Sequence, residues 1–341
     1  MYTERVADPI YDLAAKFLSP QGKPVQKVQR EQEEEAGEDS TGKPDPVVAA
    51  IQAGSLGFGF SAGGLLFPYY LGVLEGLSGL GILTPDTKLG GASAGSLIAV
   101  SWHSGLPLSE IQDACFVFAD NCRRNGTRGR LGVVLRQFLE DLLPEDIHLR
   151  CKDRAYVAVT RAFPVFKGEL YSEWSSREDL INSLMTSCHI PWYFNNQLMT
   201  EFHGAMHFDG GLTNFIPLPP TQHAIRVCCF PSKQVQTVLD IGISPDTYEA
   251  WPYSLAEMLR FALQPADHHV LRAFIAKGKS DAEAWALASG AADAVKAIDR
   301  DAVKEDREDR KEEYSELKDG DVSPPKPEVP VGATTGAAPA V

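Results

Sequence analysis

The sequence predicts an α/β fold: a three-layer α/β/α domain with a mostly parallel central sheet and flanking helices. Strand and helix signals alternate between residues 51 and 290, an order typical of layered α/β domains. The short apolar runs at 155–160 (AYVAVT) and 226–230 (RVCCF) fit strands of a covered sheet. With 341 residues, 44% of them hydrophobic, the chain is long enough to enclose a sizeable core.

The first strand is expected at 55–61 (SLGFGFS), which runs into a glycine turn and an apolar helix at 69–82. Pro68 suits the first turn of that helix, where its missing N–H is not needed. A helix is expected at 176–187 because Ser176 precedes Asp179 by three residues, which is a capping-box spacing. The remaining elements, all short apolar runs, are strands at 87–90, 155–160, 205–208, 226–230 and 236–243 and a helix at 96–105.

Three regions are expected along the chain. Residues 1–50 are an N-terminal extension with a disordered acidic linker, residues 51–290 form the folded domain, and residues 291–341 are a charged, largely disordered tail. The ends are rich in Glu, Lys and Pro, and they cannot bury enough apolar surface to offset the entropy of ordering. They also carry most of the net charge of −14.

Several classes of protein are excluded by composition. No run of about 18 apolar residues occurs, and the N-terminus lacks the basic-then-apolar order of a secretory signal. We therefore expect a cytoplasmic protein without a signal peptide or transmembrane helix, whose contact with membranes or lipid droplets is peripheral. The net negative charge gives no reason to expect a nucleic-acid partner. The six cysteines show no metal-ligand spacing and are expected to be reduced, buried thiols.

Gly91-Ala92-Ser93-Ala94-Gly95 fits the G-x-S-x-G pattern of a nucleophile elbow. In such an elbow a serine hydroxyl is exposed on a sharp turn between a strand and a helix, and small neighbours let the backbone close on itself. The expected strand before Ser93 and the expected helix after it give the required context. The pentapeptide alone is equally compatible with a simple glycine-rich turn.

Ser61-Ala62-Gly63-Gly64-Leu65 supplies a second element. Acyl transfer builds negative charge on a carbonyl oxygen, and a glycine turn before a helix offers backbone N–H groups to hold that charge. Gly63, Gly64 and Leu65 are therefore candidate oxyanion-hole donors. The alternative is a phosphate-binding loop, although neither of the usual glycine-rich phosphate motifs is present.

Phe208-Asp209-Gly210-Gly211 is the third element. An aspartate on a tight glycine turn at a strand end can reach a serine hydroxyl and accept its proton. Taken alone, Asp-Gly is more often only a turn.

Together and in this order, the three motifs resemble the patatin-like phospholipase family, and within it the branch that includes adipose triglyceride lipase. The resemblance covers residues 54–220. It implies a Ser93–Asp209 catalytic dyad, an oxyanion hole at Gly63, Gly64 and Leu65, a glycerolipid substrate, and no metal or other cofactor. It also implies that Ser93 forms an acyl-enzyme, which water then cleaves. The segment 187–191 (SCHIP) resembles the loop that lies beside the active site in this family.

Four alternatives remain open at this point. A Ser-Asp-His triad would use His268 or His269 with Asp240. A catalytically silent lipid-binding or scaffold protein is suggested by Phe67, which stands where the family pattern has a glycine. A transacylase would use the same serine. The segment 249–263, rich in aromatic and apolar residues, fits a core-facing helix better than one that seeks a lipid surface. The sequence indicates no protein partner.

Overall fold

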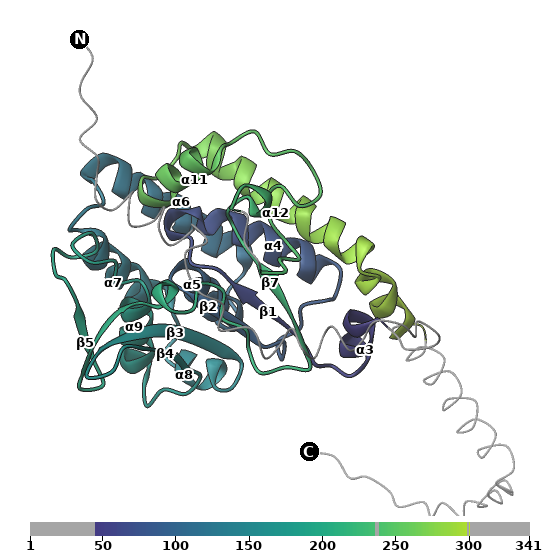
Figure 1. Cartoon of the computed structure of the whole chain (residues 1–341), viewed down its shortest axis with the longest axis horizontal. Coiled ribbons are helices and arrows are strands. Elements are labelled where there is room, and N and C mark those ends of the chain that lie inside the picture. Colours follow the sequence, from purple (N-terminus) through teal and green to yellow (C-terminus); the bar gives the residue numbers. More distant parts are fainter. Residues whose placement is uncertain (1–44, 236–238, 299, 301–341) are drawn as a thin grey trace, which may run out of the picture. The chain divides into compact units, whose positions relative to one another are not determined.

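The computed structural model describes residues 45–235, 239–298 and 300, and the compact unit closes at Lys296 (Figure 1). The strands are β1 (Leu56–Phe60), β2 (Leu89–Ala92), β3 (Ala155–Phe163), β4 (Lys167–Tyr171), β5 (Thr200–Phe202), β6 (Ala205–Asp209) and β7 (His223–Val227). The helices are α3 (Pro46–Gln52), α4 (Phe67–Gly79), α5 (Ala94–His103), α6 (Leu108–Asn125), α7 (Leu131–Leu142), α8 (Ile147–Cys151), α9 (Arg177–Ser187), α10 (Ser232–Val235), α11 (Leu255–Leu263) and α12 (His268–Ala288), with 3-10 turns η2 (Gly64–Leu66) and η3 (Gly210–Leu212).

The strands form one mixed sheet in the order β5-β6-β3-β2-β1-β7, and β4 pairs with the other edge of β3. Strands β7, β1, β2 and β3 are parallel, whereas β4 and β6 run antiparallel to β3 and β5 runs antiparallel to β6. The predicted α/β class with flanking helices is confirmed. The parallel part of the sheet extends from β3 to the edge strand β7, and the side beyond β3 is antiparallel.

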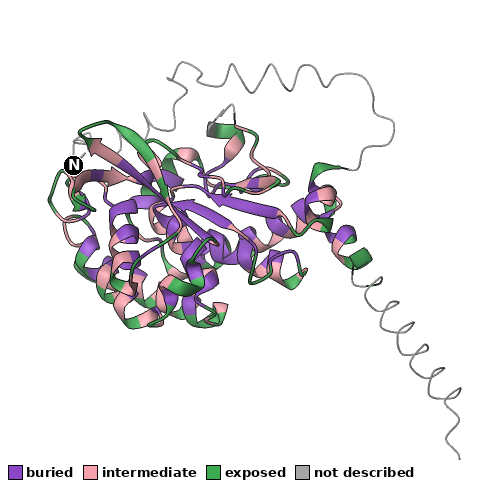
Figure 2. Cartoon of the chain, turned by 90° about the horizontal axis from the view of Figure 1, so that it is seen from below, coloured by how far each residue is buried: buried purple, intermediate pink, exposed green. Residues whose placement is uncertain are grey.

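The long helices cover one face of this sheet (Figure 2). Phe58, Leu89 and Val157 point to that face and are fully buried. The two connections from β1 to β2 and from β2 to β3 advance in the same direction, so right-handed crossovers bring both sets of helices to the same side. On the other face, Gly57 and Gly59 pack directly against the backbone and side chains of 217–221. Over β1 and β2, the third layer is therefore an irregular segment instead of helices.

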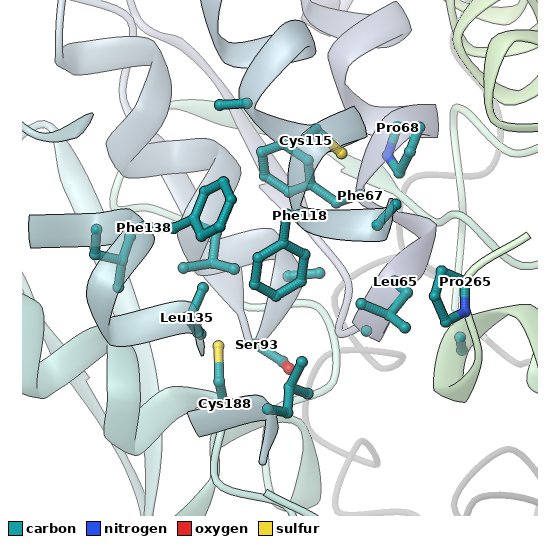
Figure 3. Close-up of a pocket in the computed structure, with 18 of the residues that line it drawn as sticks. Leu65, Phe67, Pro68, Ser93, Cys115, Phe118, Leu135, Phe138, Cys188 and Pro265 are labelled. Carbon is teal, nitrogen blue, oxygen red and sulfur yellow. The ribbon is translucent and has the colours of Figure 1, made fainter. Parts of the chain in front are cut away.

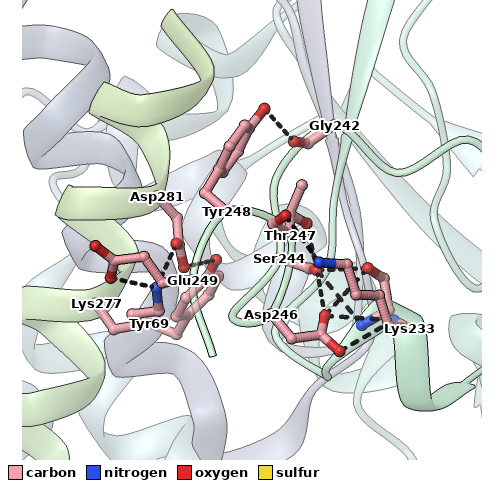
Figure 4. A network of polar contacts seen from close by, with 11 residues as sticks. Tyr69, Lys233, Gly242, Ser244, Asp246, Thr247, Tyr248, Glu249, Lys277 and Asp281 are labelled. Atoms are coloured by element: carbon pink, nitrogen blue, oxygen red, sulfur yellow. Dashed lines mark hydrogen bonds and ion pairs between the residues drawn. The ribbon is translucent and has the colours of Figure 1, made fainter. Parts of the chain in front are cut away.

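Helix α12 packs along α4, and a polar network joins this pair to the loop before α11 (Figure 4). The ammonium group of Lys277 contacts Asp281 at 2.8 Å and Glu249 at 3.1 Å, and the Tyr69 hydroxyl donates to Asp281 at 2.9 Å. Burial raises the pKa of the Asp281 carboxyl to about 6, although Lys277 and Tyr69 lower it. The network satisfies buried polar groups that would otherwise be costly.

Most of the expected elements are present, with three differences. The strand expected at 226–230 is β7, which ends at Val227 because its neighbour β1 ends at Phe60 in the same register. Residues 236–238 lie outside the described residues, and 239–243 contribute only a bridge between Ile243 and Val227, so the strand predicted at 236–243 is wrong for the part that is described. The boundary expected after residue 50 falls inside α3.

The acidic linker before residue 45 and the tail after residue 300 lie outside the described residues. All six cysteines are free thiols, and five of them are buried. Within the part of the chain that is described, no helix is both long and apolar enough to cross a bilayer.

Candidate active site

Ser93 occupies a strained turn between β2 and α5. Its backbone adopts φ 51° and ψ −122°, an unusual conformation for a residue with a side chain, and it caps the N-terminus of α5. A Cβ on Gly91 would collide with the carbonyl of Gly95, and a Cβ on Gly95 would collide with the carbonyl of Phe60. The two glycines of the motif are therefore required by close backbone contact, which is the geometry of a nucleophile elbow.

Asp209 is the last residue of β6, and it caps η3. Its Oδ1 accepts a hydrogen bond of 2.8 Å from the Gly211 N–H, while Oδ2 is buried and has no hydrogen-bond partner among the described residues. Burial raises the pKa of this carboxyl to about 7, although the Gly211 N–H and the Ser93 hydroxyl lower it. The residue as a whole is half-buried, so it is the carboxyl end that is removed from water.

The Ser93 hydroxyl is thus close enough to Asp209 to influence the pKa of its carboxyl, but no regular hydrogen bond joins the two side chains. Both side chains line the same cavity.

The segment 187–191, which follows α9, holds both residues in place. The Ser93 N–H donates to the Ser187 hydroxyl at 2.9 Å, and the Asp209 N–H donates to the carbonyl oxygen of His189 at 2.9 Å. Cys188 and Ile190 point from the same segment into the cavities beside Ser93. One short stretch of chain therefore fixes the backbones of two residues that are 116 positions apart.

The glycine loop faces the same space. Gly64 has φ +54°, and a Cβ on it would collide with the carbonyl of Ala262. In the described part of the chain, the N–H groups of Gly63, Gly64 and Leu65 donate no hydrogen bond to the protein, so they remain available to an oxyanion. Phe67 adopts φ −43° and ψ −37° at the start of α4. A helical residue needs no glycine, so its Cβ leaves the turn undisturbed.

Two apolar cavities meet at Ser93 and Gly64. The first, of about 120 Å³, runs from Ser93 between α5, α6 and α7 and is lined by Phe118 and Phe138 (Figure 3). The second, of about 460 Å³, lies between the glycine loop, Asp209 and α11. Among the described residues that line them, none is cationic and Asp209 is the single acid. Such walls suit long acyl chains and exclude charged groups.

Comparison with known proteins identifies the family. The family model described as patatin-like phospholipase matches residues 60–221. The human patatin-like phospholipase domain-containing protein 4 is 34% identical over 186 residues, which are 51% of this chain and 71% of that protein. The chain belongs to the patatin-like phospholipase family. Its relatives in this family include lipases, acyltransferases and transacylases. Membership of the family therefore supports a lipid-modifying enzyme.

Two other family members show the range of named activities. The mouse omega-hydroxyceramide transacylase is 27% identical over 241 residues, 66% of this chain and 40% of that protein. The human 1-acylglycerol-3-phosphate O-acyltransferase PNPLA3 is 30% identical over 183 residues, 50% of this chain and 37% of that protein. The chain thus spans less than half of either of these longer relatives. A solved structure of VipD from Legionella pneumophila aligns with a TM-score of 0.39 at 12% identity, over 68% of this chain and 66% of that one, too low for any inference.

The structure adds residues that the motifs did not reveal. Ala94 follows Ser93, lines the first cavity, and its N–H donates no hydrogen bond within the described residues, so it is a further candidate oxyanion donor in this patatin-like site. Ser187 and His189 were placed near the site by resemblance, but their hydrogen bonds depend on the packing of α9. The sequences of α6 and α7 show only the ordinary amphipathic pattern of helices, which does not indicate that these helices form a cavity wall.

The triad alternative finds no support in the geometry. All eight histidines are described, and none lines either cavity at Ser93. His268 instead contacts Asp120 at 2.8 Å, and Asp240 lies beside Arg226 through its carbonyl oxygen. The glycine loop opens onto walls without cations, which is unlike a phosphate site. Helix α11 faces the core, which is the orientation that the sequence favours for segment 249–263. Leu259 and Leu263 line the second cavity.

Proposed function

We propose that this protein is a lipid acyl hydrolase in which Ser93 is the nucleophile and Asp209 is the base. The observation that carries the proposal is the pairing of a serine on a strained elbow with a desolvated carboxyl whose Oδ2 is free, in one apolar cavity. Removal of water from the carboxyl raises its proton affinity toward neutral pH, where a general base is most effective.

The reaction follows from these positions. Oδ2 of Asp209 takes the proton of the Ser93 hydroxyl while the serine oxygen attacks the ester carbonyl. The N–H groups of Gly63, Gly64 and Leu65, with that of Ala94, stabilise the oxyanion. The alcohol leaves with the proton from Asp209, and an acyl group remains on Ser93. Water then gives a proton to Asp209 and attacks the acyl carbonyl, and Asp209 returns that proton to the Ser93 oxygen as the fatty acid leaves.

The first cavity suits the acyl chain, because it leads away from Ser93 between apolar helices. The second, larger cavity suits the rest of the substrate. Since no cation lines it among the described residues, a phosphate headgroup would be buried there unpaired, which is costly. This favours a neutral acylglycerol over a phospholipid as the substrate.

A second candidate, transfer of the acyl group to an alcohol, is favoured by the same cavity. An apolar space of about 460 Å³ beside Ser93 is able to hold an apolar alcohol acceptor in place of water. Hydrolysis and transfer would share the acyl-enzyme and differ in the second step. A catalytically silent lipid-binding protein would retain the cavities without this chemistry.

The test is hydrolysis of a short-chain chromogenic ester and of emulsified triacylglycerol by the wild type, Ser93→Ala and Asp209→Asn. We expect both variants to lose activity by at least about a thousandfold. Ser183→Ala, which changes a buried serine that lines neither cavity, and His269→Ala are controls that should retain it. Loss of activity in His269→Ala would instead favour the triad.

A parallel measurement distinguishes the other candidates. A fluorophosphonate probe should label wild type and Ser183→Ala but leave Ser93→Ala unlabelled. Adding monoacylglycerol as an acceptor separates transfer from hydrolysis, because transfer forms diacylglycerol in place of free fatty acid. Failure of the wild type to react with either ester or probe would leave the silent lipid-binding protein as the better description.

A further inference from the structure

The connection between β3 and β4 exposes large apolar side chains at its tip. Phe163 is 70% exposed, Val165 is 61% exposed and Phe166 is 58% exposed. Single exposed apolar residues are common on protein surfaces, but three within four positions form a contiguous patch, which usually marks a contact site. This patch, the hairpin tip, comprises residues 163–166.

The hairpin tip lies at the same edge of the sheet as the candidate active site. In the pairing of β3 with β6, Asp209 is opposite Val159 and Met206 is opposite Phe163. Along β3, the tip therefore begins four residues after Val159, the partner of Asp209. This corresponds to about 13 Å in the strand direction. Figure 1 shows β3, β4 and β5 together at one side of the sheet.

The rim of the second cavity also exposes apolar side chains. Trp192 and Leu198 line that cavity and are 54% and 43% exposed. Leu198 leads directly into β5, which pairs with β6, which in turn pairs with β3. The rim of the cavity and the hairpin tip are thus connected through three neighbouring strands, β5, β6 and β3.

The charges beside the tip indicate which kind of partner it fits. Arg161 and Lys167 flank the tip, and both contact Glu169, at 2.9 Å and 3.2 Å. Glu169 thus neutralises one of the two cations, which leaves the hairpin with a single net positive charge. The chain carries a net charge of −14, so one positive charge at the hairpin gives it little attraction to an anionic surface. Apolar insertion without strong electrostatic attraction fits a neutral or zwitterionic surface.

We propose that the hairpin tip inserts into a zwitterionic lipid surface, such as a phosphatidylcholine monolayer over neutral lipid, and places the mouth of the second cavity against it. Insertion removes Phe163, Val165 and Phe166 from water. Delivery of an ester from that surface to Ser93 rests on the proposed function, whereas the insertion itself does not.

Flotation of the full-length protein with phosphatidylcholine-coated triolein droplets tests the proposal. The variant carries Phe163→Ser, Val165→Ser and Phe166→Ser, and we expect its bound-to-free ratio to fall at least about tenfold, given the apolar area removed. The matched control, Leu149→Ser with Leu287→Ser, changes residues that are 63% and 70% exposed on α8 and α12, and it should bind like the wild type. Circular dichroism and fluorophosphonate labelling report whether each variant is folded.

Three results would overturn the inference: unchanged flotation of the hairpin variant, an equal loss in the control, or binding that requires an anionic lipid. The proposed function is read separately. If the wild type floats and the hairpin variant does not, the inference holds even when neither reacts with the probe. If both react with the probe and hydrolyse a soluble ester, but only the wild type hydrolyses triolein droplets, both proposals are supported.

Discussion

The backbone N–H of Ser93 donates a hydrogen bond of 2.9 Å to the side-chain hydroxyl of Ser187. This bond ties the elbow between β2 and α5 to the end of α9, and both residues are buried. A buried N–H without an acceptor costs about 1–3 kcal/mol. The strained backbone of Ser93 is therefore held by a side chain from another part of the chain.

Replacement of Ser187 by alanine should loosen the elbow. We expect Ser187→Ala to lower the free energy of unfolding by about 1–3 kcal/mol and to lower kcat by about tenfold or more, with a smaller effect on KM, because a displaced nucleophile weakens the transition state. Denaturant unfolding and steady-state kinetics measure the two effects. Ser183→Ala is the control: Ser183 is buried in the same helix but donates only to the Leu180 carbonyl oxygen. An equal loss of kcat in both variants would contradict this role of Ser187.

The pH dependence of activity should report the ionisation of Asp209. Burial raises the pKa of its carboxyl to about 7, and a base must be deprotonated to accept a proton. We expect kcat/KM for an uncharged short-chain ester to rise with pH, with an apparent pKa of about 7, and to level off at higher pH. An acid limb centred near pH 4, the range of an ordinary carboxyl, would show that Asp209 is not the titrating base.

The same carboxyl should reduce stability at high pH. Its pKa in the folded state lies above the unfolded value of 3.8, so the folded state holds the proton that the unfolded state releases. The stabilising contribution is complete below about pH 4 and is lost as the pH rises to about 7. Asn resembles the protonated acid, so we expect Asp209→Asn to raise the free energy of unfolding by about 2–4 kcal/mol at pH 8 and hardly at all near pH 4.

Urea unfolding at both pH values measures this difference. Asp240→Asn is the control, because Asp240 is exposed and the substitution should change stability little at either pH. A variant that is less stable than the wild type at pH 8 would mean that the ionised carboxyl is stabilised in the fold.

The first cavity should limit the length of the acyl chain. Ala114 on α6 lines this cavity, and Ala114→Phe would fill a large part of its volume of about 120 Å³. We expect kcat/KM for a palmitoyl ester to fall about 10- to 100-fold relative to that for a butyryl ester. Val117→Phe, on the same helix but 58% exposed, is the control. Equal losses for both chain lengths in Ala114→Phe would place the acyl chain elsewhere.

Local patterns explain how much of the molecule the sequence predicts. The glycines at 91 and 95 fit a turn that only small residues allow, so the strand, elbow and helix around Ser93 could be read from a few adjacent positions. The capping pattern at Ser176 likewise predicts the start of α9, where its hydroxyl accepts from the Asp179 N–H at 3.1 Å. In contrast, the run at 236–243 has the composition of a strand, but in its described part only Ile243 pairs with a neighbour.

By itself, the sequence determined the α/β class, the family, and the order in which the glycine loop, Ser93 and Asp209 occur. Only the tertiary structure decided that the helices gather on one face, that Ser187 and His189 hold Ser93 and Asp209, and that two cavities meet at the serine. The physical reason is the distance along the sequence over which each interaction acts. Turn geometry and capping act between neighbours in sequence, whereas the desolvation of Asp209 and the cavity walls arise when α5, α7, α9 and β6 pack together.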